Sequence, residues 1–581
     1  MDFNPHINYF AQTDFRGRKQ VFGIKSEDRM RHMYVIGKTG MGKSTMLENL
    51  AIQDIKNGAG LAFVDPHGSS ADTLLDFVPQ DRIKDVIYIA PFDTSYPIAF
   101  NVMEDVGPDG RHLVVSGLMS AFKKIWVDAW SARMEYILTN ILLALLEYPD
   151  STLLGVNRMI ADKKYREKVV ANITDPGVKS FWVDEYAKYT DRFTAEATPA
   201  IQNKVGQFTA NPLIRNIIGQ PKSSFDFRQA MDDKKILIIN LSKGRVGEMN
   251  TNLLGSMIIT KLYLAAMSRA TLSSMELKQA PPFYLYVDEF QSFANESFAD
   301  ILAEARKYKL ALILAHQYVE QMSEEVRDAV FGNVGTTVAF RVGPLDAELL
   351  EKLFFPTFTK EDLVALGFAQ IYLSLMIDGV GSPPFSATTL PSIVNTENSF
   401  KDEIIAQSRK TYASTRDLTE TGINTWMSGE QPPNSKESPA ESKNPSPKRK
   451  DKPKPKPEEP KKPKQQFSSK KKEDKPQETV SLKDLQTKNK EKDKTKNKTA
   501  NSEHRQQLRE ALSELMAEEK TETVKETPAE IKSEEKKDKP AETPVAEKDN
   551  NSPKKEEQVN SKPPEVPEEL LKKMLADDGE K

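Results

Sequence analysis

The residues at positions 37 to 44 have the types and the spacing of a loop that binds nucleotide phosphates. They are Gly37, Lys38, Thr39, Gly40, Met41, Gly42, Lys43 and Ser44. Glycines in this pattern let backbone N–H groups turn inward around phosphate oxygens. We expect Lys43 to reach the β- and γ-phosphates, Ser44 to bind Mg²⁺ and Thr45 to lie near the α-phosphate. The pattern therefore predicts an ATP site that uses Mg²⁺.

A strand that ends in two acidic residues is the second candidate for chemistry. The apolar run Phe283–Asp288 is followed directly by Glu289. The carboxyl ends of parallel strands meet at one edge of a sheet, so this pair is expected beside the phosphate-binding loop. Asp288 is predicted to hold Mg²⁺ through water, and Glu289 to polarise the attacking water. With the loop, the pair predicts hydrolysis of the nucleotide.

Two other predicted strands also end in polar residues. Gln317 follows the run Ala311–Ala315 and is expected to sense the γ-phosphate by orienting water, or else to cap the strand end. His316 is interpreted as a packing residue. The sequence Asp65-Pro66-His67-Gly68 follows the second strand, and it either positions Glu289 or water or serves only as a turn.

Many ATPases of this kind take an arginine from the neighbouring subunit to stabilise the transferring phosphate. Arg306 lies between the strand that ends at Asp288 and the strand that precedes Gln317, and Arg341 ends the following strand. Either arginine is a candidate for this role, and either one could instead form a surface ion pair.

Composition excludes several other chemistries. The chain has no cysteine, which rules out disulfides, thiolate metal sites and thiol catalysis, and its six histidines show no paired spacing. Its net charge of −3 gives no overall attraction to nucleic acid. No signal peptide is visible, and the longest apolar stretch, Tyr136–Leu146, is shorter than the roughly 20 residues of a membrane helix. We expect a cytoplasmic protein.

Alternating apolar strands and helices predict an α/β fold with a mainly parallel sheet. The predicted strands are His32–Ile36, Leu61–Asp65, Val86–Ala90, Ile236–Leu241, Phe283–Asp288, Ala311–Ala315, Thr336–Arg341 and Gln370–Ile377, after an entry hairpin at Lys19–Ile24. Residues 105–224 read almost wholly helical and predict an all-helical insertion domain. The sheet domain is then discontinuous, with residues 1–104 and 225–396.

The remaining residues, 397–581, are rich in Lys, Glu and Pro and predict a disordered tail. Within it, residues 503–520 and 568–576 have leucines at helical spacing and predict short amphipathic helices, with or without a docking role. Residues 448–475 form a basic block, which could hold DNA phosphates or serve as a solubilising linker.

In combination, these motifs resemble the FtsK–HerA superfamily of P-loop ATPases, and most of all its conjugative coupling-protein branch (TraG and TraD type). The resemblance rests on Arg31–Ser44, Val64–Gly68, Trp130–Arg133, Gly247–Asn250 and Leu254–Gly255, together with the helical insertion, and it covers residues 1–396. It implies a RecA-like sheet domain and a homo-hexameric ring that pumps DNA through its pore. It also implies that Gln317 is the sensor glutamine and that Arg306, eleven residues earlier, is the arginine acting in trans.

Coupling proteins of this branch usually carry N-terminal transmembrane helices, and no such stretch occurs in this sequence. The alternatives are a coupling protein that partners recruit to the inner face of the membrane, and a DNA motor with another task. Partners of this kind would be secretion-channel or relaxosome-like proteins, bound through the insertion or the tail. A secretion or pilus-assembly ATPase that moves protein instead of DNA is a further reading of the same site.

Overall fold

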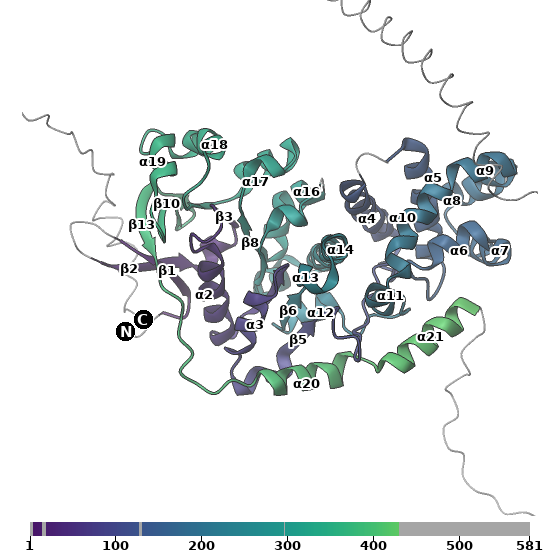
Figure 1. Ribbon diagram of the computed structural model, residues 1–581, viewed down its shortest axis with the longest axis horizontal. Helices are drawn as coiled ribbons and strands as arrows, with labels where there is room; N and C mark the ends of the chain where they lie inside the picture. The colour runs from purple at the N-terminus through teal and green to yellow at the C-terminus, as the bar shows by residue number, and fades with distance from the viewer. Residues whose placement is uncertain (1–3, 14–18, 127–129, 296, 429–581) are drawn as a thin grey trace, which may run out of the picture. The chain divides into compact units, whose positions relative to one another are not determined.

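Eleven strands form one mixed sheet in the computed structural model, which describes residues 4–428 apart from 14–18, 127–129 and 296 (Figure 1). They are β1 (Ile7–Gln12), β2 (Val21–Lys25), β3 (Met33–Ile36), β4 (Gly60–Asp65), β5 (Val86–Ile89), β6 (Ile236–Asn240), β7 (Phe283–Val287), β8 (Leu310–His316), β9 (Thr336–Ala339), β10 (Gln370–Ser374) and β13 (Phe385–Thr389). Their order is β2-β1-β13-β10-β9-β3-β8-β7-β4-β6-β5.

Most of this sheet is parallel, which confirms the predicted fold class. The strands from β9 to β5 in that order pair in parallel, whereas β10, β13, β1 and β2 continue the sheet in antiparallel pairs. The eight predicted strands are present within one or two residues, whereas the predicted entry hairpin at Lys19–Ile24 is a single strand, β2, which pairs with β1. One of the eight is divided in two, because β10 ends before β11 (Met376–Ile377), which pairs with β12 (Val380–Gly381) in a separate ribbon.

Both faces of the parallel strands are buried, because each strand is apolar on both sides. In β3, Met33 and Val35 join one apolar cluster, while Tyr34 and Ile36 join the other. Helices α2 (Lys43–Lys56) and α3 (Ser69–Leu75) cover the first face. The opposite face is covered by α12 (Phe227–Asp232), α14 (Glu248–Met267), α16 (Ser297–Glu304), α17 (Glu324–Asn333), α18 (Pro344–Phe354) and α19 (Lys360–Ala365).

Between β5 and α12, the regular elements of the described residues are helices, and we call the α-helices among them the helical segment. They are α4 (Arg111–Ile125), α5 (Ala132–Glu147), α6 (Gly155–Ala161), α7 (Lys163–Asn172), α8 (Pro176–Ser180), α9 (Asp191–Ala197), α10 (Pro199–Ala210) and α11 (Pro212–Ile218). The segment meets the sheet layer where α4 packs on α14. A Cβ added at Gly117 of α4 would lie 2.4 Å from Cγ2 of Thr260, so the two helices touch closely there.

Two helices follow the sheet in a stretch that the sequence assigns to the disordered tail. They are α20 (Lys401–Tyr412) and α21 (Arg416–Ser428). The predicted start of the tail at residue 397 is therefore wrong. Ile404 of α20 and Ile423 of α21 are almost fully buried, so a few apolar side chains suffice to hold these polar helices on the rest of the fold.

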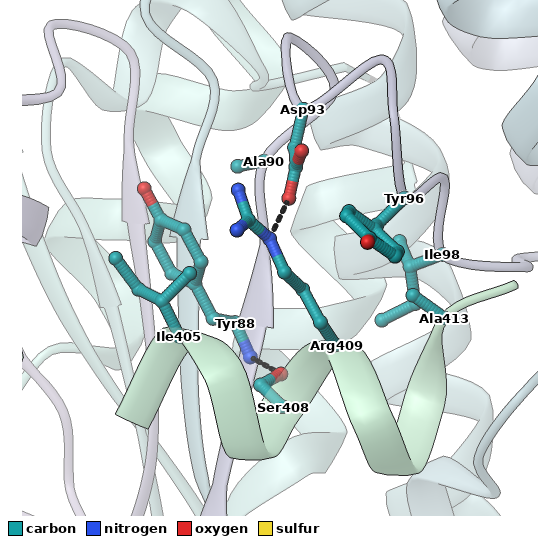
Figure 2. Close-up of a pocket in the computed structure, with 9 residues that line it drawn as sticks. All are labelled: Tyr88, Ala90, Asp93, Tyr96, Ile98, Ile405, Ser408, Arg409 and Ala413. Atoms are coloured by element: carbon teal, nitrogen blue, oxygen red, sulfur yellow. Dashed lines mark hydrogen bonds and ion pairs between the residues drawn. The ribbon is translucent and has the colours of Figure 1, made fainter. Parts of the chain in front are cut away.

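Helix α20 lies along β5, the edge strand of the sheet (Figure 2). The backbone N–H of Tyr88 in β5 donates to Oγ of Ser408 at 2.9 Å, and Nε of Arg409 donates to Asp93 at 2.7 Å. An exposed edge strand leaves backbone groups without partners, and a covering helix is one way to supply them. Ser408 therefore replaces a neighbouring strand at this position.

Helix α21 continues from α20 onto the helical segment (Figure 1). The indole N–H of Trp426 donates to the carbonyl of Asp150 at 2.9 Å, and Nη1 of Arg158 donates to the carbonyl of Trp426 at 2.8 Å. Residues 397–428 thus join the edge of the sheet to the helical segment.

The other expectations for the tail concern residues 429–581, including the basic block and the amphipathic stretches at 503–520 and 568–576, and these lie outside the described residues. Across residues 4–428, wherever the chain is described, no helix combines the length and apolar character that crossing a membrane requires.

Candidate nucleotide-binding site

The loop Gly37–Ser44 joins the end of β3 to the start of α2, as its sequence predicts. Two of its glycines are required by geometry. A Cβ added at Gly37 would come within 2.5 Å of Cβ of Phe340, and Gly42, which precedes α2, has a φ of 112°. A side chain would clash at the first position and be strained at the second. The loop can therefore approach a ligand with its backbone.

Lys43 lies in the first turn of α2 and is almost fully buried. Its ammonium donates to the carbonyls of Gly37 at 2.5 Å and Lys38 at 3.2 Å. Burial lowers the pKa of Lys43, while the carboxylates of Glu289 and Asp288 oppose that shift. The amine therefore stands between the loop and the two acidic residues, where a phosphate group would meet it.

Ser44 and Asp288 meet as a magnesium site would require. Oγ of Ser44 donates to Oδ2 of Asp288 at 3.1 Å. Burial raises the pKa of Asp288 to about 6, and the neighbouring carboxylates of Glu289 and Asp65 add to the shift. A bound cation would reverse this effect. Two adjacent oxygen ligands fit Mg²⁺, which takes few protein ligands and completes its shell with phosphates and water. Thr45 follows in the same turn of α2.

Glu289 is held in a rare backbone conformation, with a φ of 49°. Its carboxylate accepts hydrogen bonds from the side-chain amides of Gln317 and Gln291, and it lies 3.8 Å from Nε2 of His67. Burial disfavours its charged form. The contacts with His67, Gln317 and Gln291 outweigh burial and lower the pKa of this carboxyl to about 2. Glu289 is therefore an oriented carboxylate at neutral pH.

Gln317 connects this carboxylate to the phosphate-binding loop. Its amide nitrogen donates to Glu289, and its amide oxygen accepts from Oγ1 of Thr39 at 2.8 Å. The side chain thus bridges the end of β8 and the loop after β3, two neighbouring strands. A group in this position can respond to a ligand on one side and move the carboxylate on the other.

The turn after β4 makes contacts that fit both of the roles that its sequence leaves open. Asp65 accepts from the backbone N–H groups of His67 at 2.7 Å and Ala71 at 2.9 Å, so it fixes the turn. His67 faces Glu289, and the contact with that carboxylate raises the pKa of the imidazole. His316 accords with a packing role, because it is buried and its Nδ1 lies 2.9 Å from the hydroxyl of Tyr34.

Gln291 belongs to this site, although its sequence gives little sign of it. It lies two residues after Glu289 in a short 3-10 turn, η8 (Phe290–Ser292), that reverses the chain after β7. Proximity to Glu289 in the sequence is the only signal, because nothing in the residue types shows that the turn brings the amide back to the carboxylate.

The two candidate arginines lie in different places. The carbonyl of Arg341 accepts from the N–H of Lys38 at 2.8 Å, so its backbone adjoins the phosphate-binding loop of its own chain. Arg306 is exposed in a 3-10 turn before β8. Burial lowers the pKa of His32 to about 4, and the charge of Arg306 adds to this shift. His32 lies before the start of β3, whereas the phosphate-binding loop follows the end of β3. Arg306 is near His32, so it is not part of the site in its own chain.

A phosphate-binding loop, an acidic pair after a central strand and a bridging glutamine meet at the carboxyl edge of a parallel sheet. Fold and site together define a P-loop ATPase. The family model of the type IV secretion-system coupling protein DNA-binding domain matches residues 21–354, which is more than half of the 581 residues. The chain belongs to this family, which confirms its resemblance to coupling proteins.

Among curated proteins, no sequence matches this chain. Similar solved structures include the bacterial conjugative coupling protein TrwBdeltaN70, with 14% identity over 67% of this chain and 90% of that chain and a TM-score of 0.49. The plasmid coupling protein TrwB in complex with ADP and Mg²⁺ has 15% identity over 68% and 97%, with a TM-score of 0.49. VirB4 of Thermoanaerobacter pseudethanolicus has 13% identity over 68% and 98%, with a TM-score of 0.43.

Proposed function

We propose that this protein is an ATP-driven DNA motor that works as a homo-hexameric ring. Its family is defined by a DNA-binding domain of coupling proteins, and its site has the parts needed for hydrolysis. The observation that carries the proposal is the contact of Ser44 with Asp288 beside a Glu289 carboxylate that Gln317 ties to the phosphate-binding loop.

The residues divide the work of hydrolysis among them. Backbone groups of the loop Gly37–Ser44 and the ammonium of Lys43 bind the phosphates of ATP. Ser44 and Asp288 hold Mg²⁺, which supplies positive charge to the phosphate oxygens. Glu289 orients the attacking water and polarises its O–H bond, while Gln317 keeps that carboxylate in place. The low pKa of Glu289 suits orientation and polarisation better than complete removal of a proton.

Subunit contacts would complete the site. Arg306 is exposed and lies apart from the loop of its own chain, which supports a role at a neighbour's nucleotide. We assign it the role of the arginine acting in trans, and we assign DNA contact to the ring pore. The helical segment, within the proposed insertion domain 105–224, would form the entrance for DNA and partner proteins.

DNA-stimulated ATP hydrolysis tests the proposal. We expect the turnover of ATP by the full chain to rise when double- or single-stranded DNA is added. The variant Lys43→Ala should be inactive with and without DNA, which excludes a contaminating ATPase. ATP turnover that DNA leaves unchanged would reject the DNA motor, and stimulation by a secreted protein alone would favour a protein-moving ATPase.

A further inference from the structure

One lysine of helix α4, in the helical segment, contacts the turn that follows the acidic pair. The ammonium of Lys124, in the last turn of α4, donates to the carbonyls of Gln291 and Ala294, both at 2.5 Å. The two carbonyls are three residues apart and belong to the turn directly after Glu289. One side chain therefore holds the end of this turn from outside the sheet layer.

The same turn is fixed from the sheet layer. Phe290 and Phe293 are fully buried, and the ring of Phe293 fills the space that a Cβ at Gly255 of α14 would occupy. Lys243, which follows β6, donates to Oγ of Ser292 at 3.0 Å. The backbone of the turn is thus held on one side by its own layer and on the other by Lys124.

These contacts form one path, which passes through hydrogen bonds and through the residue Gln291 itself. Lys124 binds the carbonyl of Gln291, and the side-chain amide of Gln291 donates to Glu289. The opposite oxygen of that carboxylate accepts from Gln317, which in turn accepts from Thr39 of the phosphate-binding loop. A path of direct contacts therefore runs from the helical segment to the nucleotide site.

The position of Lys124 is costly, which argues for a specific role. Burial and the nearby ammonium of Lys243 lower the pKa of Lys124 to about 8. A buried amine is tolerated when its donors are satisfied, and carbonyl oxygens do this for Lys124. Met or Leu would fill the same space without the cost of desolvating an amine.

We propose that Lys124 is a positioning residue, through which the helical segment sets the orientation of Gln291 and therefore of Glu289. A displacement of α4, such as a ligand on the helical segment would cause, pulls on the turn and moves the carboxylate relative to the attacking water. The inference rests on the proposed role of Glu289 in ATP hydrolysis.

Substitution of Lys124 tests this. We expect Lys124→Met to lower kcat for ATP by about tenfold or more while the KM for ATP and the Kd for ADP change by less than about twofold. Lys124→Arg keeps the donors and should recover most of the loss. Lys163→Met removes an exposed lysine of the same segment and should leave kcat unchanged. A folded Lys124→Met with wild-type kcat overturns the proposal.

A second measurement keeps the test decisive if Lys124→Met does not fold. Lys124→Gln retains a shorter donor, and Gln291→Leu removes the amide that reaches Glu289. Residues that act through one chain of contacts have non-additive effects, so the double variant should be no slower than the slower single variant. Multiplied losses in the double variant contradict the proposal.

The glutamate variant separates this inference from the function on which it rests. If Glu289→Gln is inactive and Lys124→Met is normal, only the role of Lys124 fails. If Glu289→Gln retains normal turnover, the proposed role of Glu289 fails, and the role of Lys124 fails with it.

Discussion

At the scale of single residues, Glu289 shows how much of this site depends on backbone geometry. Its φ of 49° is rare for a residue with a side chain, and such conformations persist where surrounding contacts hold them. Here the contacts are the buried turn that follows and the amides of Gln317 and Gln291. This conformation places the carboxylate near Asp288 and Lys43, where we propose that the attacking water lies.

The variant Glu289→Gln tests this residue. The amide is nearly isosteric but cannot polarise water as a carboxylate does, so we expect ATP turnover to fall by about 10²- to 10⁴-fold. ATP binding should persist, because Lys43 and the loop remain. Turnover by phosphate release and binding of a fluorescent ATP analogue measure the two effects. The exposed control Glu361→Gln should behave as wild type, and an active Glu289→Gln would remove this residue from the role.

The residues that a fixed motif specifies could be predicted from the sequence, whereas those brought in by packing could not. The loop Gly37–Ser44 and the acidic pair have characteristic spacings, and the structure brings them together. Gln291 and Lys124 have no such signal. Their contact joins positions 167 residues apart, and it depends on how closely α4 and α14 approach.

At the scale of elements, the buried ion pair of Arg29 and Asp54 joins α1 (Ser26–Arg29), α2 and β7. Nη1 of Arg29 lies 2.7 Å from Oδ1 of Asp54, and the hydroxyl of Tyr286 completes the cluster at 2.5 Å from Oδ2. Both ionic side chains are at most 3% exposed. Each charge is thus buried only because the other is present.

Removal of one partner should therefore be costly. We expect Asp54→Ala to lower the free energy of unfolding by about 3–5 kcal/mol, because it leaves a buried guanidinium unpaired. Glu324→Ala breaks the exposed ion pair with Arg327 and should cost about 0–1 kcal/mol. Urea denaturation of both variants measures the contrast. Equal losses in the two variants would contradict the buried role of the first pair.

Strands were easier to predict than the two C-terminal helices, for a physical reason. A parallel strand is buried on both faces and appears as an unbroken apolar run. Helix α20 buries only Ile404 among its apolar side chains and docks through polar groups such as Ser408 and Arg409. Its sequence therefore resembles the charged tail that follows, and only the edge of β5 reveals its partner.

The docking of α20 gives a direct prediction. We expect Ile404→Ala to destabilise the protein by about 2–5 kcal/mol, because the removed atoms leave a cavity against the apolar cluster under β5 and η2 (Gln80–Asp85). Lys410→Ala, on the exposed side of the same helix, should change stability by less than about 0.5 kcal/mol. If Ile404→Ala unfolds at the wild-type urea concentration, α20 does not depend on this contact.

At the scale of the whole molecule, residues 397–428 join parts that lie far apart in the sequence. They contact β5 at one end and the helical segment at the other. They form a second connection between the sheet and that segment, in addition to the contact that Lys124 of α4 makes with the turn after Glu289. Movement of the helical segment would therefore pull on both the turn after Glu289 and the edge of the sheet.

Assembly is the last property to test, because the trans role that we propose for Arg306, which lies apart from the loop of its own chain, requires a ring. Arg306→Ala and Lys43→Ala should each be inactive alone, since one lacks the donated arginine and the other lacks phosphate binding. Mixed rings should regain part of the ATP turnover, because an intact loop can then face an intact arginine. Rings assembled from both variants, verified by mass, provide the measurement. Mixed rings that stay inactive would mean that Arg306 acts within its own subunit, or that Arg341 is the arginine acting in trans.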